Sequence, residues 1–165
     1  MQDDFNNWQP NMTPEHSAPR QPDMPMKWHK FLIYFSLWAG GILNAVSGFN
    51  HLTGNVYGDE AAMVYNYFES LKGVDMIYGL ALIALGVFQI FTRFQLAGFK
   101  RNGPSILVIS YVAVLAASVL YGVIVGGIID VSLLDAINPT SIGISIAMII
   151  CNKVYYDKRA HMFVN

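Results

Sequence analysis

His51 and Asp75 are the two ionisable residues that the pattern of this chain can bring together. His51 stands at the end of one apolar run, and Asp75 stands at the beginning of the next. If these runs are antiparallel helices, both side chains lie at the same level, with Asn50 and Tyr78 beside them. A His–Asp pair can bind metal, relay protons or act in acid–base chemistry. The alternative is structural, because an aspartate in the first turn of a helix interacts favourably with the helix dipole.

Small and weakly polar residues recur at four-residue spacing within the apolar runs. The three sets are Gly40, Asn44 and Gly48; Ser118, Gly122 and Gly126; and Ser141 and Ser145. Small residues let helix backbones approach closely in lipid, where packing and hydrogen bonds drive helix association. We expect these sets to pack the helices of one chain against each other. A seam between two copies of the chain, through Gly122 and Gly126, is the alternative.

Three polar residues, Asn44, Ser118 and Ser145, stand near the middle of three apolar runs. They predict a polar layer across the helices. Interhelical hydrogen bonds of this kind contribute about 0.6 kcal/mol each on average. A substrate site at that depth would need an ionisable companion, and the runs supply none, so we interpret the layer as an adhesive contact between helices.

The elements that must position these residues are four apolar runs, at about 31–53, 74–92, 104–129 and 139–155. The third run has 26 residues without a charge. An uncharged apolar run of about 18 residues or more is typical of a transmembrane helix. Charged residues make up only 13% of the chain, against about 25% in soluble domains. The expected fold class is therefore all-α, a polytopic membrane protein with a four-transmembrane-helix bundle over residues 27–165.

Two further segments flank the runs. Residues 1–26 contain five of the seven prolines and no apolar period, which predicts a disordered tail. Residues 54–73 have a possible N-cap at Asp59 and a glycine stop at Gly73. Apolar residues between them share one helical stripe, namely Met63, Val64, Tyr67, Phe68 and Leu71. This pattern predicts a short amphipathic helix in the outer membrane interface.

The distribution of charge predicts the topology. Nine of the ten lysines and arginines lie in the N-terminal tail, the connection after residue 92 and the C-terminal segment. The other two connections contain only Lys72 among the basic residues. Because basic residues mark cytoplasmic loops, we expect a multi-pass protein of the cell (cytoplasmic) membrane with both termini in the cytoplasm. The lipid bilayer is then its main partner, and nothing in the charge pattern suggests nucleic acid.

The sequence lacks the residues that several membrane activities require. The predicted span interiors carry no carboxylate, which argues against a proton-coupled exporter of the small multidrug type. A membrane cytochrome needs paired histidines at mid-span, and His29 and His51 stand at opposite ends of one run. With Cys151 as the single cysteine, neither a disulfide nor a zinc cluster is expected. We therefore expect no catalytic residue, metal or cofactor.

One sequence signature resembles a known family. The first motif is C-terminal, Asn152-Lys153-x-Tyr155-Tyr156-x-Lys158-Arg159-x-His161-x-Phe163. Two further motifs are Phe99-Lys100-x-Asn102-Gly103-Pro104 and Asp75-x-Ile77-Tyr78-Gly79. Together they resemble a family of small, uncharacterised bacterial four-span membrane proteins over roughly residues 27–165. Some members carry a zinc ribbon before the first span, but this chain has no cysteine there. The resemblance implies a four-helix protein of a bacterial cytoplasmic membrane and no particular activity.

These observations favour a non-enzymatic accessory or scaffold protein that acts through helix and tail contacts, with another protein or a second copy as partner. A small transporter or channel subunit is the first alternative. A membrane-embedded enzyme with an outer-face site at His51 and Asp75 is the second.

Overall fold

The computed structural model describes residues 24–132, 137 and 139–165, and this part of the chain is helical without a strand. The elements in order are α1 (Lys27–Phe31), the π-helix η1 (Leu32–Ser36), α2 (Leu37–Thr53), the 3-10 helix η2 (Asn55–Glu60), α3 (Ala61–Tyr67), α4 (Glu69–Ala97), α5 (Gly103–Ile129), α7 (Pro139–Asp157) and the 3-10 helix η3 (Ala160–Met162). The all-α prediction is confirmed for these residues. The expected tail over 1–26 lies almost wholly outside them.

Three helical stretches among the described residues are long and apolar enough to cross a membrane, namely Lys27–Tyr67, α4 and α5. Large apolar side chains face outward on all of them; Leu43 is 67% exposed, Ile77 72% and Leu120 62%. Exposed apolar surface of this extent is typical of helices that contact lipid or another protein. The 19-residue α7 is not among the three, so a fourth span remains a prediction.

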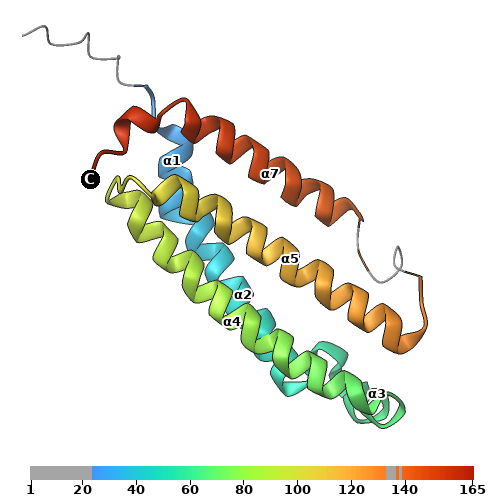
Figure 1. Cartoon of the computed structure of the whole chain (residues 1–165). Coiled ribbons are helices and arrows are strands. Elements are labelled where there is room, and N and C mark those ends of the chain that lie inside the picture. The colour runs from blue at the N-terminus through green and yellow to red at the C-terminus, as the bar shows by residue number, and fades with distance from the viewer. Residues whose placement is uncertain (1–23, 133–136, 138) are drawn as a thin grey trace, which may run out of the picture.

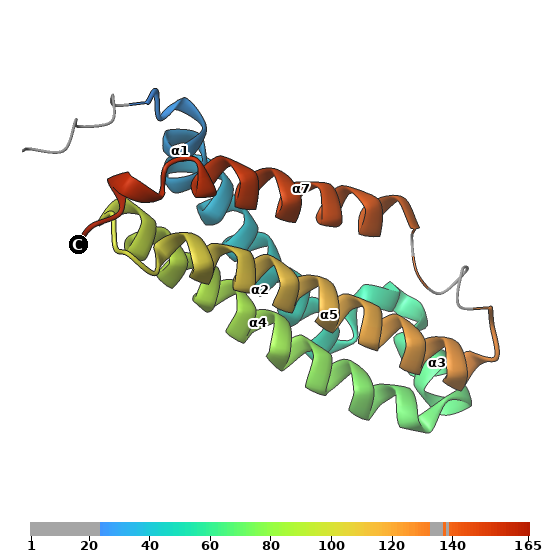
Figure 2. The same cartoon turned by 45° about the horizontal axis from the view of Figure 1, so that its top comes forward.

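Figure 1 shows the long helices running alongside each other, with the C-terminus and α1 at one end of the molecule and α3 at the other. We call these the terminal end and the α3 end. Figure 2 shows that α7 accompanies α5. The buried side chains of α7 are Asn152 and Tyr156, both in its C-terminal half. Its described contacts therefore concentrate at the terminal end.

Glycines bring α2 and α4 into backbone contact. A Cβ atom on Gly48 would lie 2.5 Å from the Gly79 carbonyl oxygen, and a Cβ on Gly79 would lie 2.6 Å from that of Gly48. Gly41 and Gly86 form a second pair of the same kind, at 2.9 and 2.6 Å. Seven residues separate the two glycines on each helix, which is the repeat of a left-handed helix pair. Gly40, also expected at a helix contact, faces the Gln89 side chain of α4 and not a backbone carbonyl.

The face that α4 buries repeats every seven residues. Asp75, Leu82, Gln89 and Leu96 are all buried at that spacing. Two of these four are polar, and each has a partner across the bundle. Asn44 Nδ2 donates to Gln89 Oε1 at 3.1 Å, which is an interhelical hydrogen bond of the kind that joins helices in lipid.

Asn44, Ser118 and Ser145 do not bond to one another, so the polar layer expected from them is not formed. Ser118 Oγ instead lies 3.4 Å from the Tyr78 hydroxyl of α4. Ser118 Oγ donates to the Val114 carbonyl, and Ser145 Oγ donates to the Ser141 carbonyl, both within their own helices. Serine commonly satisfies its hydroxyl in this way in a helix. Of the small residues expected at helix contacts, Gly122 and Gly126 are buried within the chain, whereas Ser118 and Ser141 are exposed.

The apolar core lies at the terminal end. Its buried members are Leu32, Ile33, Leu37, Leu96, Leu107, Tyr156 and Phe163. The π-helix η1 lies within this core, and the Arg93 Nε–H donates to the Ile33 carbonyl at 3.1 Å. A π-helix interrupts the regular hydrogen-bond ladder, and Arg93 supplies a donor to one of its carbonyls.

At the α3 end the chain reverses through irregular backbone. Gly54 ends α2 in the left-handed region at φ 75°, and Gly58 adopts φ 56° inside η2. Phe68 is non-helical and separates α3 from α4. The single amphipathic helix expected from Asp59 to Gly73 is therefore divided, with Asp59 in η2 and Gly73 inside α4. The seven residues of α3 bury no side chain, and their place at a membrane interface remains a prediction.

Candidate functional site

Asp75 is the centre of a polar cluster at the α3 end. Its side chain is fully buried, near the start of α4 on the seam that faces α2. The Tyr121 hydroxyl of α5 donates to Oδ1 at 2.7 Å, and the Tyr65 hydroxyl of α3 donates to Oδ2 at 3.0 Å. A buried carboxylate needs such donors. Each oxygen of Asp75 therefore accepts a hydrogen bond from a phenol, and the Tyr57 hydroxyl of η2 also interacts with this carboxylate.

His51 faces the same carboxylate from α2. Its Nδ1 atom lies 3.7 Å from Asp75 Oδ1, which is too long for a hydrogen bond. Nδ1 is buried and has no hydrogen-bond partner, while the side chain as a whole is 10% exposed. An unpartnered buried nitrogen beside a carboxylate can accept a proton.

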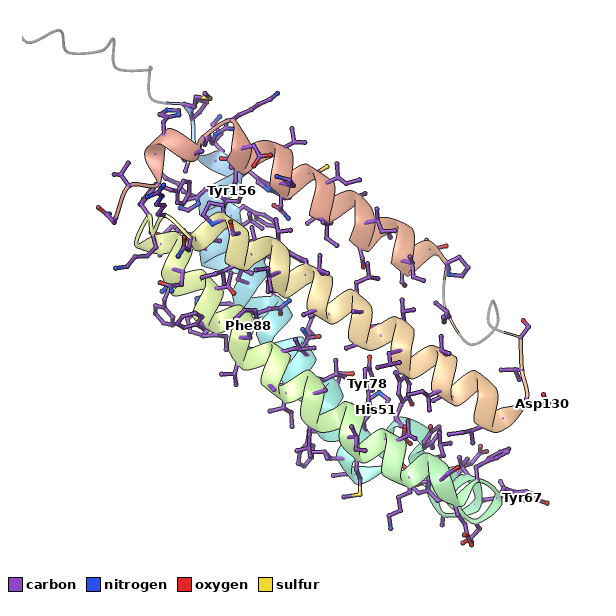
Figure 3. The ribbon with its side chains drawn as sticks, viewed as in Figure 1. His51, Tyr67, Tyr78, Phe88, Asp130 and Tyr156 are labelled. Carbon is purple, nitrogen blue, oxygen red and sulfur yellow. The ribbon has the colours of Figure 1, made fainter. Side chains whose placement is uncertain are left out.

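Tyrosine rings enclose the imidazole. Tyr78 and Tyr121 stack with centroids 4.0 Å apart and planes 11° apart. The His51 ring packs edge-on against both, at 4.9 and 5.1 Å, and Figure 3 shows His51 and Tyr78 next to each other between the long helices. Tyr57 packs edge-on against Tyr65 at 5.6 Å. Edge-to-face contacts are favourable arrangements of aromatic rings, so they fix the imidazole in place.

The backbone explains why these residues meet. The glycine contact of Gly48 with Gly79 lies one turn from both His51 and Asp75, and holds α2 and α4 close enough for the pair. The positive φ of Gly54 then turns the chain so that α3 returns toward α4. The Tyr65 ring packs over Gly54, where a Cβ atom would be 2.9 Å from Tyr65 Cε2. A larger residue at position 54 would displace the ring.

Three of the four residues of the predicted outer site lie together in the structure, and the fourth does not. His51 and Asp75 lie together, and Tyr78 packs against His51 while its hydroxyl lies 3.4 Å from Ser118 Oγ. Asn50 is outside the cluster, because its side chain accepts a hydrogen bond from Asn55 at 3.3 Å.

Sequence reasoning missed Tyr65 and Tyr121. The available signal was that a tyrosine hydroxyl among apolar neighbours requires a partner, and Asp75 is the nearest acceptor.

The cluster fits proton chemistry better than metal binding. Among the described residues no group of three His, Cys, Asp or Glu side chains could hold a metal ion. His51 and Asp75 supply only two ligands, and both Asp75 oxygens already accept phenol hydrogens. A structural zinc site uses four protein ligands and a catalytic one uses three. The arrangement can instead bind a proton on the imidazole or the carboxylate.

A second buried histidine lies at the terminal end. His29 Nδ1 is 2.9 Å from the Tyr156 hydroxyl, and the rings of Phe99, Tyr156 and Phe163 surround it at 5.1–5.9 Å. On the same helix as Tyr156, Asn152 accepts a hydrogen bond from the Trp28 indole at 2.9 Å. No carboxylate of the described residues pairs with His29, so this cluster ties the N- and C-terminal segments together.

Comparison of the chain with protein-family models, with curated proteins and with solved structures gave no match.

Proposed function

We propose that the chain is an integral protein of the cell membrane that spans it four times, with both termini in the cytoplasm. Three helical stretches have the required length and apolarity, and α7 would be the fourth span. An even number of membrane crossings is supported by Figure 1, in which α1 and the C-terminus lie at the same end of the molecule. The basic residues of α1, the 98–101 turn and the C-terminal segment belong to that end, in agreement with the rule for cytoplasmic loops. The α3 helix then lies at the outer interface.

Within this topology, we infer an accessory or scaffold protein that acts through helix and tail contacts. The observation that carries this inference is the use of the interior polar groups. Asn44 bonds to Gln89 and so joins α2 to α4, and the buried hydroxyls of Thr92 and Ser110 are satisfied by carbonyls of their own helices. The outward faces of α5 and α7 stay apolar and open to another helix.

The transporter or channel alternative requires a polar path from one end of the bundle to the other. At the α3 end two separate polar contacts join α4 to α5, Asp75–Tyr121 and Tyr78–Ser118, and Ser118 in turn donates to the Val114 carbonyl of its own helix. The next interhelical polar pair among the described residues is Asn44 with Gln89 on a different pair of helices. We therefore expect purified protein in liposomes to carry no ion or solute flux above that of empty liposomes. Flux that the purified protein alone sustains would favour the alternative.

The topology is tested with reporter fusions. Fusions after Gly98 and after Asn165 should report the cytoplasm, and fusions after Asn55 and Ser132 should report the outside. A reversed reporter after Ser132 alone would show that α5 does not cross, and a reversed reporter after Asn165 would show that α7 does not cross. Either outcome would contradict four spans.

The scaffold role is tested by site-specific photocrosslinking in membranes. A photoreactive residue at Ile144, 61% exposed on α7, should crosslink a discrete protein partner or a second copy. The matched control is the same residue at Leu82, 3% exposed in the seam, which should give no intermolecular product. Crosslinks to lipid only at Ile144, and at further exposed positions of α5 such as Leu120, would contradict a role through helix contacts.

A further inference from the structure

The α3 helix has few packing contacts that could hold it in position. It is seven residues long and buries no side chain. Met63 is 56% exposed and Tyr67 80% exposed, and Figure 3 shows Tyr67 at the tip of the α3 end. An isolated helix of this length is not stable in water. Its position must therefore come from specific contacts with the helices beneath it.

The Tyr65 side chain makes the specific contact. It is the residue of α3 that reaches the buried cluster, and its hydroxyl donates to Asp75 Oδ2 across ten positions of sequence. Its ring packs over Gly54 and against Tyr57. A hydrogen bond to an ionised carboxylate is about twice as strong as one between neutral groups. The strength of the hydrogen bond that holds α3 in position thus depends on the charge of Asp75.

Both ends of the segment that carries Tyr65 can hinge. Before α3, Gly54 and Gly58 have positive φ angles, a region in which glycine moves without steric cost. After α3, Phe68 has φ −127° and ψ 73°, outside the helical region. Residues 55–67 can therefore lift without unwinding α2 or α4, and lifting them uncovers Asp75.

The cluster beneath α3 has an unbalanced charge. The titratable groups that face one another there are His51 from α2, Tyr57 from η2, Tyr65 from α3, Asp75 and Tyr78 from α4, and Tyr121 from α5. With His51 neutral, the ionised Asp75 gives this set a net charge of −1. One added proton makes the set neutral, whether it resides on His51 or on Asp75. His51 Nδ1, buried and unpartnered, lies where that proton is shared.

We propose that the His51–Asp75 pair is a proton-binding site and that α3 is its lid, latched by the Tyr65 hydroxyl while the pair carries its negative charge. Binding of a proton weakens the latch, because the phenol then donates to a neutral pair. The lid opens about Gly54 and Phe68, and water reaches the site. Deprotonation restores the charge and closes the lid. The inference concerns the α3 end and does not depend on the scaffold role.

Hydrogen–deuterium exchange of the full chain in lipid nanodiscs tests the latch. Tyr65→Phe keeps the ring and removes the hydroxyl, so protection of the α3 amides should fall by about tenfold, or about 1.4 kcal/mol. Tyr67→Phe is the matched control on the same helix, since Tyr67 is exposed, and it should exchange like the native chain. Protection of the α4 amides at 82–92 reports that the bundle is folded. If Tyr65→Phe retains native protection of α3, the latch does not exist.

Exchange at about pH 7 and about pH 4, corrected for intrinsic rates, tests the proton site over the ordinary titration range of imidazole and carboxyl groups. Protection of α3 should fall at the lower pH in the native chain. In Asp75→Asn it should be low at both values, because the amide offers one acceptor oxygen for two phenols. In His51→Phe the fall should move to lower pH, since the pair then offers one site for the proton instead of two. Opening of α3 that is independent of pH in the native chain, or unaffected by either substitution, would overturn the proposal.

Discussion

Two buried histidines, one at each end of the bundle, show how neighbours decide what the same side chain does. His29 is 2% exposed and His51 is 8% exposed, and tyrosine rings pack against both. At the terminal end the partner of His29 is a neutral phenol, and the surroundings are the apolar core. At the α3 end the partner of His51 is a carboxylate with two phenol donors. The first cluster holds the chain ends in place by packing, whereas the second concentrates a charge that must be balanced.

The largest effect is expected where packing dominates. Phe163→Ala should destabilise the protein by about 3 kcal/mol, because it removes a buried ring from the core and from contact with His29 and Tyr156. Thermal unfolding in detergent measures the loss. Val164→Ala, next in sequence but 76% exposed, is the control and should be nearly neutral. A small effect of Phe163→Ala would mean that the C-terminal segment is not part of the core.

An intermediate effect is expected where charge dominates. Asp75→Ala should cost about 2 kcal/mol, since the partly buried hydroxyls of Tyr65 and Tyr121 lose their acceptor. Asp59→Ala changes an exposed acid at the same end and should leave the unfolding temperature nearly unchanged. Equal stabilities of the two variants would show that the Asp75 hydrogen bonds are not formed in the membrane.

The smallest effect is expected for the neutral pair of the terminal end. Tyr156→Phe keeps the buried ring and removes the hydroxyl that pairs with His29 Nδ1 at 2.9 Å. The expected cost is about 1 kcal/mol, measured by the same unfolding assay with Tyr34→Phe, 69% exposed, as the control. A cost as large as that of Asp75→Ala would remove the contrast between the two ends.

The helices could be predicted because long uncharged runs have few alternatives in lipid, where backbone groups must be satisfied within the segment. The faces that pack could not be predicted as well. In a soluble helix a polar face marks the outside, but here residues such as Ile77 and Leu120 are apolar and outward-facing. The seven-residue spacing of Asp75, Leu82, Gln89 and Leu96 was the usable signal. It identifies the buried face of α4 and would have added Gln89 as the partner of Asn44.

Only part of the candidate site could be predicted, and the reason differs from that for the helix faces. The proximity of His51 and Asp75 follows from a hairpin of two helices. Tyr65 and Tyr121 depend on the backbone at Gly54, Gly58 and Phe68, where the predicted helix is divided, and on how α5 packs against α4. No local pattern in the sequence encodes these two features, so the phenol donors were absent from the predicted site.

The contact between Gly48 and Gly79 also limits how this protein can change over evolutionary time. The nearest obstacle to a side chain at either position is the carbonyl oxygen of the other glycine, which is present whatever residue occupies that position. No second substitution in the pair can therefore compensate for the first, and the two positions do not drift as a covarying pair. The remaining route is to move the helices apart, which would also separate His51 from Asp75. Descendants that keep the polar cluster should keep both glycines, and lineages that lose one should lose the cluster with it.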